Sequence, residues 1–232
     1  MRVLAFPHAG GGASSFRVLA KAMPPDVELV AVQPPGREAR LDTPAIIGAR
    51  AIADAALPAL TVELDVPVVL FGHSFGALIA YEVARTLART GRPARLLVSS
   101  AHRAPDDPPD HAKLHESDEP TLFAALQSYG GLPKEVLECR ELVDMILPTM
   151  RADLESDYTY AFDPAAGPCA CPVVSIVADA DPSVSRTQGE GWSRFTQGPF
   201  FYESIGGDHF PHIDPDGARR VVAILLKALG IP

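Results

Sequence analysis

Short apolar runs recur along the chain, and longer amphipathic stretches separate them. The runs are rich in β-branched residues and bounded by proline, glycine or charged residues, which is typical of buried strands. They predict six strands: Arg2–Phe6, Val27–Gln33, Val66–Phe71, Arg95–Ser100, Pro172–Ala178 and Phe200–Ile205. Helices are expected between them at Ser14–Met23, from Asp42 and Pro44 to Leu60, and at Ala77–Thr90, Ser185–Thr196 and Pro215–Leu229. This alternation predicts an α/β fold, with a mostly parallel sheet that has helices on both faces.

One long stretch between Ser100 and Pro172 breaks the alternation, because it holds no convincing strand. Amphipathic patterns predict helices at Glu119–Tyr129, Lys134–Glu138 and Glu141–Leu154 instead. We therefore expect one domain over residues 1–232, with a helical lid insertion at 103–168 over the carboxyl edge of the sheet. The alternative is a helical decoration remote from any site.

Composition narrows the classes of protein that fit. The apolar fraction of 47% suffices for a substantial core, but no apolar run reaches the ~18 residues that span a bilayer. The N-terminus is too short before Pro7 for a signal peptide, so we expect a cytoplasmic protein with no membrane partner. The net charge of −9 argues against nucleic acid as a partner. No second Cys/His pair lies at zinc-site spacing from Cys169 and Cys171, so no metal site is expected.

The candidate chemistry begins at Ser74, in Gly72-His73-Ser74-Phe75-Gly76, directly after a predicted strand and before a predicted helix. This context is typical of the nucleophile elbow of α/β-hydrolases, in which a strained turn exposes the serine hydroxyl. Glycine is needed at positions 72 and 76 because side chains there would collide with the neighbouring strand and helix.

A serine nucleophile needs a histidine base and an acid that orients it, and in this fold they follow the serine in the order acid, then histidine. Of seven histidines, only His209 and His212 lie late enough; His209, just after the last strand, is preferred. His73 is expected to point away, and His102, His111 and His115 to be exposed. The acid is expected after the strand Pro172–Ala178, where Asp181 is preferred to Asp179 because Pro182 fixes the turn beyond it.

The oxyanion of a tetrahedral intermediate needs two N–H donors. One is expected at the backbone of Phe75. The other is expected at Ala9, in the loop His8-Ala9-Gly10-Gly11-Gly12 that follows the first strand. This glycine run lacks the Lys-Ser/Thr of a phosphate-binding loop, and we expect no cofactor.

Nearly the whole chain resembles the type II thioesterases, the free-standing editing enzymes of polyketide and nonribosomal peptide synthesis. The motifs that carry the resemblance are Phe6-Pro7-His8-Ala9-Gly10-Gly11, Gln33-Pro34-Pro35-Gly36-Arg37-Glu38-Ala39-Arg40, Gly72-His73-Ser74-Phe75-Gly76, Asp181-Pro182 and Gly207-Asp208-His209-Phe210. The resemblance implies a triad of Ser74, Asp181 and His209, oxyanion donors at Ala9 and Phe75, and a helical lid over an acyl tunnel.

The same resemblance implies hydrolysis of acyl groups from the phosphopantetheine arm of a carrier protein, by an enzyme that we expect to be a monomer. Two alternatives stay open: a small-molecule carboxylesterase or lipase with the same triad, and a non-catalytic module that binds a carrier protein. Docking of an acidic carrier protein on an acidic chain needs a local basic or apolar patch, because like charges repel within the screening length. Candidates are Arg37, Arg40, Arg140 and Arg151, which could equally be solvated surface charges.

Overall fold

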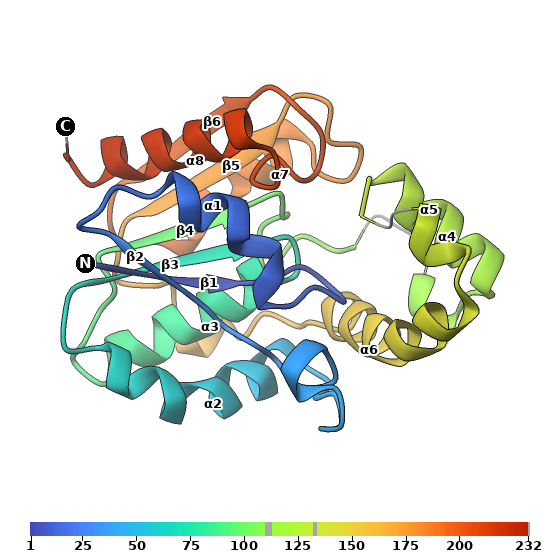
Figure 1. Ribbon diagram of the computed structural model, residues 1–232. Helices are drawn as coiled ribbons and strands as arrows, with labels where there is room; N and C mark the ends of the chain where they lie inside the picture. Colours follow the sequence, from blue (N-terminus) through green and yellow to red (C-terminus); the bar gives the residue numbers. More distant parts are fainter. Residues whose placement is uncertain (110–112, 132–133, 232) are drawn as a thin grey trace.

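Six parallel strands form one sheet in the computed structural model, which describes residues 1–109, 113–131 and 134–231. The strand order is β2-β1-β3-β4-β5-β6 (Figure 1). Their bounds are β1 Arg2–Phe6, β2 Glu28–Ala31, β3 Val68–His73, β4 Leu96–Ser100, β5 Val173–Ala178 and β6 Phe200–Ile205. The six predicted strands and the α/β fold are thereby confirmed, although β2 is shorter than the predicted Val27–Gln33.

Helices cover both faces of the sheet. On one face lie α1 (Arg17–Ala22) and α8 (Pro215–Ala228), and on the other lie α2 (Ala49–Leu60) and α3 (Gly76–Arg89) (Figure 1). Successive residues of a strand point to opposite faces, so β1 sends Val3 and Ala5 to the first layer and Leu4 and Phe6 to the second. Burial on both faces explains why the strands appear in the sequence as continuous apolar runs.

Three predicted helices differ clearly from those in the structure. The helix expected over Ser14–Met23 is divided into a 3₁₀ turn, η1 (Ala13–Phe16), and the shorter α1. The helix expected from Asp42 starts only at Ala49, because Gly48 precedes it with φ 101°, a conformation that a helix cannot contain. The helix expected over Ser185–Thr196 is divided into α7 (Arg186–Glu190) and a 3₁₀ turn, η6 (Gly191–Phe195). The remaining 3₁₀ turns are η2 (Glu38–Arg40), η3 (Thr61–Glu63), η4 (Leu114–Glu116) and η5 (Pro164–Ala166).

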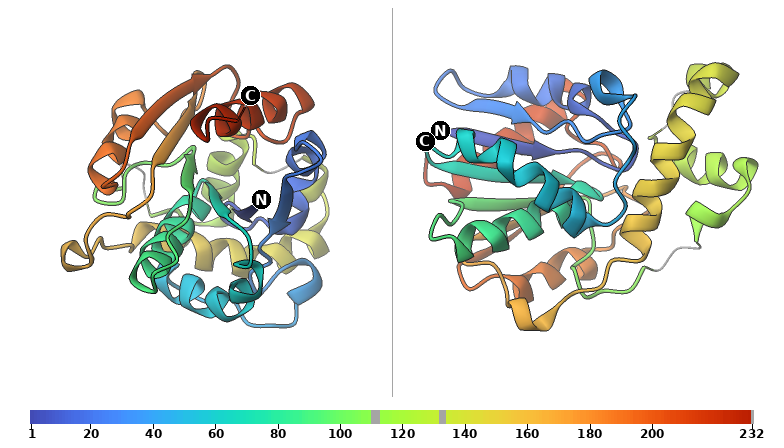
Figure 2. Two further views of the ribbon diagram at one scale, coloured as in Figure 1. Left: turned by 90° about the vertical axis from the view of Figure 1, so that its left-hand side faces the viewer. Right: turned by 90° about the horizontal axis from the view of Figure 1, so that it is seen from below.

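The segment between β4 and β5 is helical, as predicted, with α4 (Glu119–Ser128), α5 (Lys134–Leu137) and α6 (Arg140–Tyr158). The helix α6 is longer than the predicted Glu141–Leu154 and lies across the carboxyl ends of the strands (Figure 2). The segment has an apolar cluster of its own, formed by Leu114, Leu122, Leu126 and Met150. It therefore lies at the edge of the sheet where ligands of open α/β sheets bind.

Candidate active site

Ser74 lies between the end of β3 and the start of α3, in the left-handed region of backbone space with φ 52°. A non-glycine residue rarely adopts this conformation, which is strained and persists only where the surroundings impose it. Here the Ser74 N–H donates to the carbonyl oxygen of Ser100 on the neighbouring strand, at 2.7 Å. The turn thus places the serine at the carboxyl edge of the sheet.

The two glycines of the turn are required by close backbone contacts, as the sequence predicts. A Cβ on Gly72 would lie 2.4 Å from the Cα of Ala77, and a Cβ on Gly76 would lie 2.1 Å from the carbonyl oxygen of Phe6. Both distances are far shorter than a van der Waals contact. The helix α3 can therefore pack tightly against β1 and β3 only with glycine at these positions.

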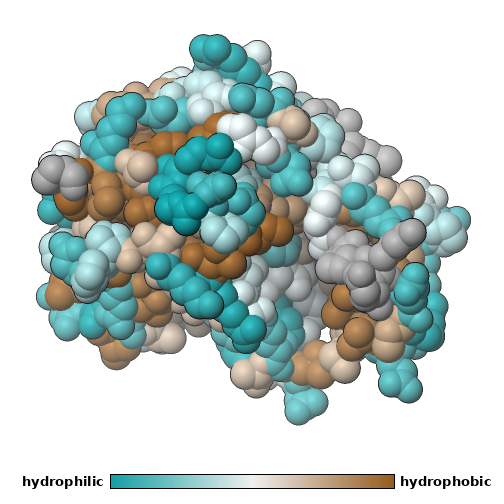
Figure 3. All heavy atoms as spheres, turned by 45° about the horizontal axis from the view of Figure 1, so that its top comes forward, coloured by the Kyte–Doolittle hydropathy of each residue, from teal (hydrophilic) through white to brown (hydrophobic). Residues whose placement is uncertain are grey.

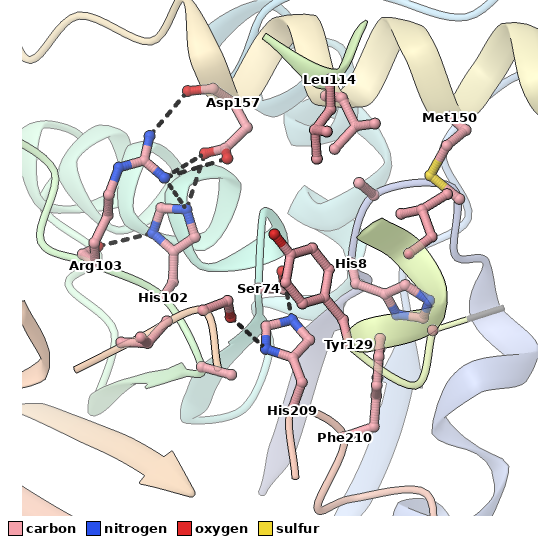
Figure 4. Close-up of a pocket in the computed structure, with 17 residues that line it drawn as sticks. His8, Ser74, His102, Arg103, Leu114, Tyr129, Met150, Asp157, His209 and Phe210 are labelled. Atoms are coloured by element: carbon pink, nitrogen blue, oxygen red, sulfur yellow. Dashed lines mark hydrogen bonds and ion pairs between the residues drawn. The ribbon is translucent and has the colours of Figure 1, made fainter. Parts of the chain in front are cut away.

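His209 lies in the loop after β6, and its Nε2 is 3.0 Å from the Ser74 Oγ (Figure 4). Its side chain is buried. His212 lies elsewhere: it is fully buried between Phe16, Phe71 and His73, and neither of its ring nitrogens has a hydrogen-bond partner among the described residues. The structure thus brings His209, and not His212, to the serine hydroxyl.

Asp181 completes the chain of hydrogen bonds. Its Oδ2 is 2.8 Å from the Nδ1 of His209, and its side chain is fully buried. Asp179 is exposed and accepts a hydrogen bond from the Ser204 hydroxyl on β6. The structure therefore brings Asp181 to the imidazole, the carboxylate that the sequence favours of the two.

Ser183 also contacts this pair, and sequence reasoning missed it. Its amide and hydroxyl donate to the Oδ1 of Asp181 at 2.8 and 2.7 Å, and its Oγ lies 2.9 Å from the Nδ1 of His209. The signal was present in Asp181-Pro182-Ser183, because an aspartate carboxylate often accepts hydrogen bonds from the residue two positions later. Burial alone would raise the pKa of Asp181, but hydrogen bonds and charge attraction from His209 and hydrogen bonds from Ser183 outweigh it, and the pKa is lowered.

Two backbone amides near Ser74 have no acceptor among the described residues. They belong to Ala9, in the loop after β1, and to Phe75, which directly follows the serine. Unpaired amides are costly unless a ligand or water binds them. Both are the amides that the sequence predicts as oxyanion donors.

A cavity of ≈ 90 Å³ opens beside Ser74, between the sheet edge and the α4–α6 segment (Figure 4). Its walls are mostly apolar, with Leu126, Met150, Leu154 and Val184 among them, and Tyr129 lies over the imidazole of His209. The surface is also hollowed between the main body and the helical segment in Figure 3. An apolar cavity beside the Ser74 hydroxyl suits an acyl chain.

One wall of this cavity is polar and is formed by His102, Arg103 and Asp157. The expectation that His102 is exposed is wrong. His102 is buried, with its Nε2 2.9 Å from the Oδ1 of Asp157 on α6. Burial lowers the pKa of His102, and the attraction of Asp157 only partly opposes this shift. Arg103 donates to both oxygens of the same carboxylate at 3.1 and 3.2 Å. The helix α6 covers the loop after β4, and the local sequence does not predict this tertiary contact.

Two further histidines were expected to be exposed. His115 is mostly buried, with only 11% of its side chain accessible, so that expectation is wrong for it too. His111 lies outside the described residues.

Of the four arginines considered for docking, Arg37 is excluded. It is buried and paired with Asp153, because the chain turns inward at Gly36, where φ is 84°. Arg151 donates to the carbonyl oxygens of His115 and Ser117. Arg140 is exposed but paired with Glu119 and Asp144, and Arg40 donates to the carbonyl of Gln33. Of the four, Arg40 and Arg140 are exposed, and only exposed arginines can contact a partner.

A parallel sheet with a serine on a strained turn after one strand, and with a carboxylate and an imidazole after two later strands, defines an α/β-hydrolase fold. The thioesterase domain family model matches residues 1–229, and the chain belongs to that family. It is a thioester hydrolase. Within the described residues, none of the helices has the length and apolar character needed to cross a bilayer.

The chain is similar to known thioesterases from biosynthetic pathways. It is 35% identical to RedJ, a thioesterase from the prodiginine biosynthetic pathway in Streptomyces coelicolor, over 98% of this chain and 90% of that one, with a TM-score of 0.90. It is 32% identical to the type II thioesterase BorB from the borrelidin biosynthetic cluster, over 98% and 92%, with a TM-score of 0.88. It is also 37% identical to part of the AMB antimetabolite synthetase AmbE of Pseudomonas aeruginosa, over 99% of this chain; it spans only 11% of that synthetase.

Proposed function

We propose that the chain hydrolyses acyl thioesters carried on the phosphopantetheine arm of a carrier protein in polyketide or nonribosomal peptide synthesis, and so removes aberrant or short acyl groups. The observation that carries the proposal is the continuous chain of hydrogen bonds from Ser74 through His209 to Asp181, at the mouth of an apolar cavity. The likeness to thioesterases of such pathways supports the choice of substrate.

In the proposed mechanism, Ser74 is the nucleophile. His209 Nε2 takes the Ser74 proton as Oγ attacks the thioester carbonyl, while Asp181 orients the imidazole and stabilises its cation. The amides of Ala9 and Phe75 donate to the oxyanion. The tetrahedral intermediate collapses and expels the pantetheine thiolate, which takes the proton from His209.

A second round releases the acyl group. His209 removes a proton from water, the hydroxide attacks the acyl-serine, and His209 returns the proton to Ser74 Oγ as the acid leaves. The net reaction consumes one water and yields a carboxylic acid and a free thiol. Residues 103–168 act as the lid over the bound acyl chain, because α4 and α6 supply one wall of the cavity. The mechanism uses groups of one chain only, which suits a monomer.

Turnover of three substrate classes tests the proposal: acyl-loaded carrier proteins, acyl-N-acetylcysteamine thioesters and nitrophenyl esters. We expect the highest kcat/KM on the carrier proteins and a loss of at least ~10³-fold in Ser74→Ala. Ser128→Ala, an exposed serine on α4, is the matched control and should keep full activity. A higher kcat/KM on nitrophenyl esters would favour a carboxylesterase. Failure of a fluorophosphonate to label Ser74, together with carrier-protein binding, would favour a non-catalytic module.

A further inference from the structure

The direction of the Ala9 N–H is set by the turn that contains it. The carbonyl oxygen of His8 accepts a hydrogen bond from the Gly11 N–H at 2.9 Å. A trans peptide unit is planar, and its C=O and N–H point in opposite directions. Since the C=O of His8 and the N–H of Ala9 belong to one peptide unit, a turn that holds the carbonyl also aims the amide.

Two side chains from distant parts of the sequence hold this turn. The Gly10 N–H donates to the Oδ2 of Asp153 at 2.8 Å, and Arg37 donates through Nη1 to the carbonyl oxygen of Gly11 at 3.0 Å. Both side chains are buried, with 7% and 1% of their surface accessible for Arg37 and Asp153. Charged side chains are rarely buried without a specific partner.

Arg37 and Asp153 also bind each other. Arg37 Nη1 lies 2.5 Å from Oδ2 and Nη2 lies 3.1 Å from Oδ1, so the guanidinium fork matches the carboxylate. The Nε of Arg37 donates to the carbonyl of Pro35 at 3.1 Å. All three guanidinium nitrogens are therefore engaged, and the geometry of the pair is tightly specified. We call Arg37 and Asp153 the loop clamp.

The clamp rests on α6, which packs closely on the same turn. Gly10 has φ 73°, and a Cβ there would lie 2.4 Å from the Cε of Met150. Thr149, which lies on α6 one turn of helix before Asp153, donates through its hydroxyl to the carbonyl oxygen of Gly36 at 2.6 Å. The loop from His8 to Gly12, the Gly36-Arg37 turn and α6 thus form one hydrogen-bonded unit. This unit gives a role to the Pro-Gly-Arg motif that the reaction itself does not use.

We propose that Arg37 and Asp153 are positioning residues that hold the Ala9 amide where the oxyanion forms. The inference rests on the proposed function, because it assigns Ala9 to the oxyanion. Neither residue lines the cavity, so the clamp acts on the transition state and not on binding of the acyl chain. Displacement of a catalytic group by about 1 Å can cost ~10²-fold in rate. Loss of the clamp should therefore lower kcat on the order of 10- to 100-fold and leave KM nearly unchanged.

The test uses four variants and a short acyl-N-acetylcysteamine thioester, which needs no carrier-protein docking. Asp153→Asn and Arg37→Lys each break the fork while leaving similar volume. The double variant Arg37→Met/Asp153→Leu removes both charges, so no buried charge is left unpaired and folding is preserved. Asp144→Asn, an exposed ion-pair carboxylate on the same helix, is the matched control.

Four quantities are measured for each variant: kcat, KM, the inhibition constant of a trifluoromethyl ketone and that of the corresponding amide. The ketone adds to Ser74 as an oxyanion and reports on the oxyanion site, whereas the amide reports on ground-state binding. We expect kcat and ketone affinity to fall together in every clamp variant, with KM and amide affinity within about 3-fold and Asp144→Asn unchanged.

Wild-type kcat and ketone affinity in the double variant would overturn the clamp, even if a single variant fails to fold. An equal loss of ketone and amide affinity would also overturn it, because that is what a merely structural role produces. Neither result touches the proposed function, because that is tested on the wild-type chain and on Ser74→Ala, by hydrolysis of the three substrate classes and by fluorophosphonate labelling.

Discussion

Asp181 accepts hydrogen bonds from two different residues, His209 and Ser183, and its side chain is wholly shielded from solvent. Burial without these donors would favour the protonated acid, which cannot orient an imidazole. The donors keep the carboxylate ionised, as the lowered pKa of Asp181 indicates. At the scale of single residues, therefore, the polar contacts around the carboxylate matter as much as its distance from His209.

Asp181→Asn is predicted to lower kcat on the order of 10³- to 10⁴-fold, because an amide can stabilise neither the required tautomer nor the imidazole cation. Asp179→Asn is the matched control, since Asp179 is exposed and bonds Ser204. Steady-state kinetics on an acyl-N-acetylcysteamine thioester measures both. Full activity in Asp181→Asn with a collapse in Asp179→Asn would reverse the assignment of the acid.

At the scale of elements, tight packing around the turn between β3 and α3 holds Ser74 at the sheet edge. The helix α3 starts only three residues after β3 ends, and its first residue, Gly76, touches the backbone of β1, so that position has no room for a side chain. The elbow is a property of three elements together, although only five residues form its motif.

Gly76→Ala is predicted to destabilise the protein by at least ~2 kcal/mol, because its Cβ would lie 2.1 Å from the backbone oxygen of Phe6, which cannot move away as a flexible side chain could. Gly206→Ala is the matched control: the nearest atom to its Cβ would be 3.9 Å away, at the end of Arg220, and its φ is not positive. Urea unfolding compares the two variants. Equal stability of both would mean that α3 can shift away from β1.

At the scale of the whole molecule, a group of histidines lies between the sheet edge and the loop that joins β6 to α8. The rings of His8, His209 and His212 each pack against the ring of His73, with ring centroids 4.3 to 5.9 Å apart. Burial lowers the pKa of His8 and of His212 to about 3, and lowers the pKa of His73 well below its ordinary value. Each of these three rings has a nitrogen with no hydrogen-bond partner among the described residues.

Stability is therefore predicted to fall as the pH falls below about 6.5. Unfolded histidines bind protons near pH 6.5, whereas the buried ones stay neutral to about pH 3, so the unfolded state binds more protons throughout this window. Each histidine that is protonated in the unfolded state and neutral in the folded state lowers the free energy of unfolding by up to ~1.4 kcal/mol for each unit that the pH falls. Urea unfolding at pH 7.5, 6.5, 5.5 and 5.0 (buffer values chosen above the carboxylate range, roughly pH 4) isolates the histidines. His212→Leu should flatten the curve, and a pH-independent wild-type curve would contradict the prediction.

Much of the site was readable from the sequence because its signals are local. A strand, a Gly-x-Ser-x-Gly turn and a helix are consecutive, so the elbow at Ser74 needs no long-range information. His209 and Asp181 follow strands whose carboxyl ends must share one edge of a parallel sheet, so their convergence follows from chain order. The choice between Asp179 and Asp181 was less secure, because both follow β5 within three residues.

The succession of strands and helices along the chain, the serine turn and the groups that meet at the sheet edge follow from the sequence alone, because periodicity, glycine positions and chain order encode them locally. Which polar groups are buried together depends on the tertiary packing. Arg37 was expected among surface charges and His102 in an exposed loop, yet α6 covers both and supplies Asp153 and Asp157 as their partners. The physical reason is that burial of a charge depends on what packs over it, and these partners lie 116 and 55 positions away in the chain.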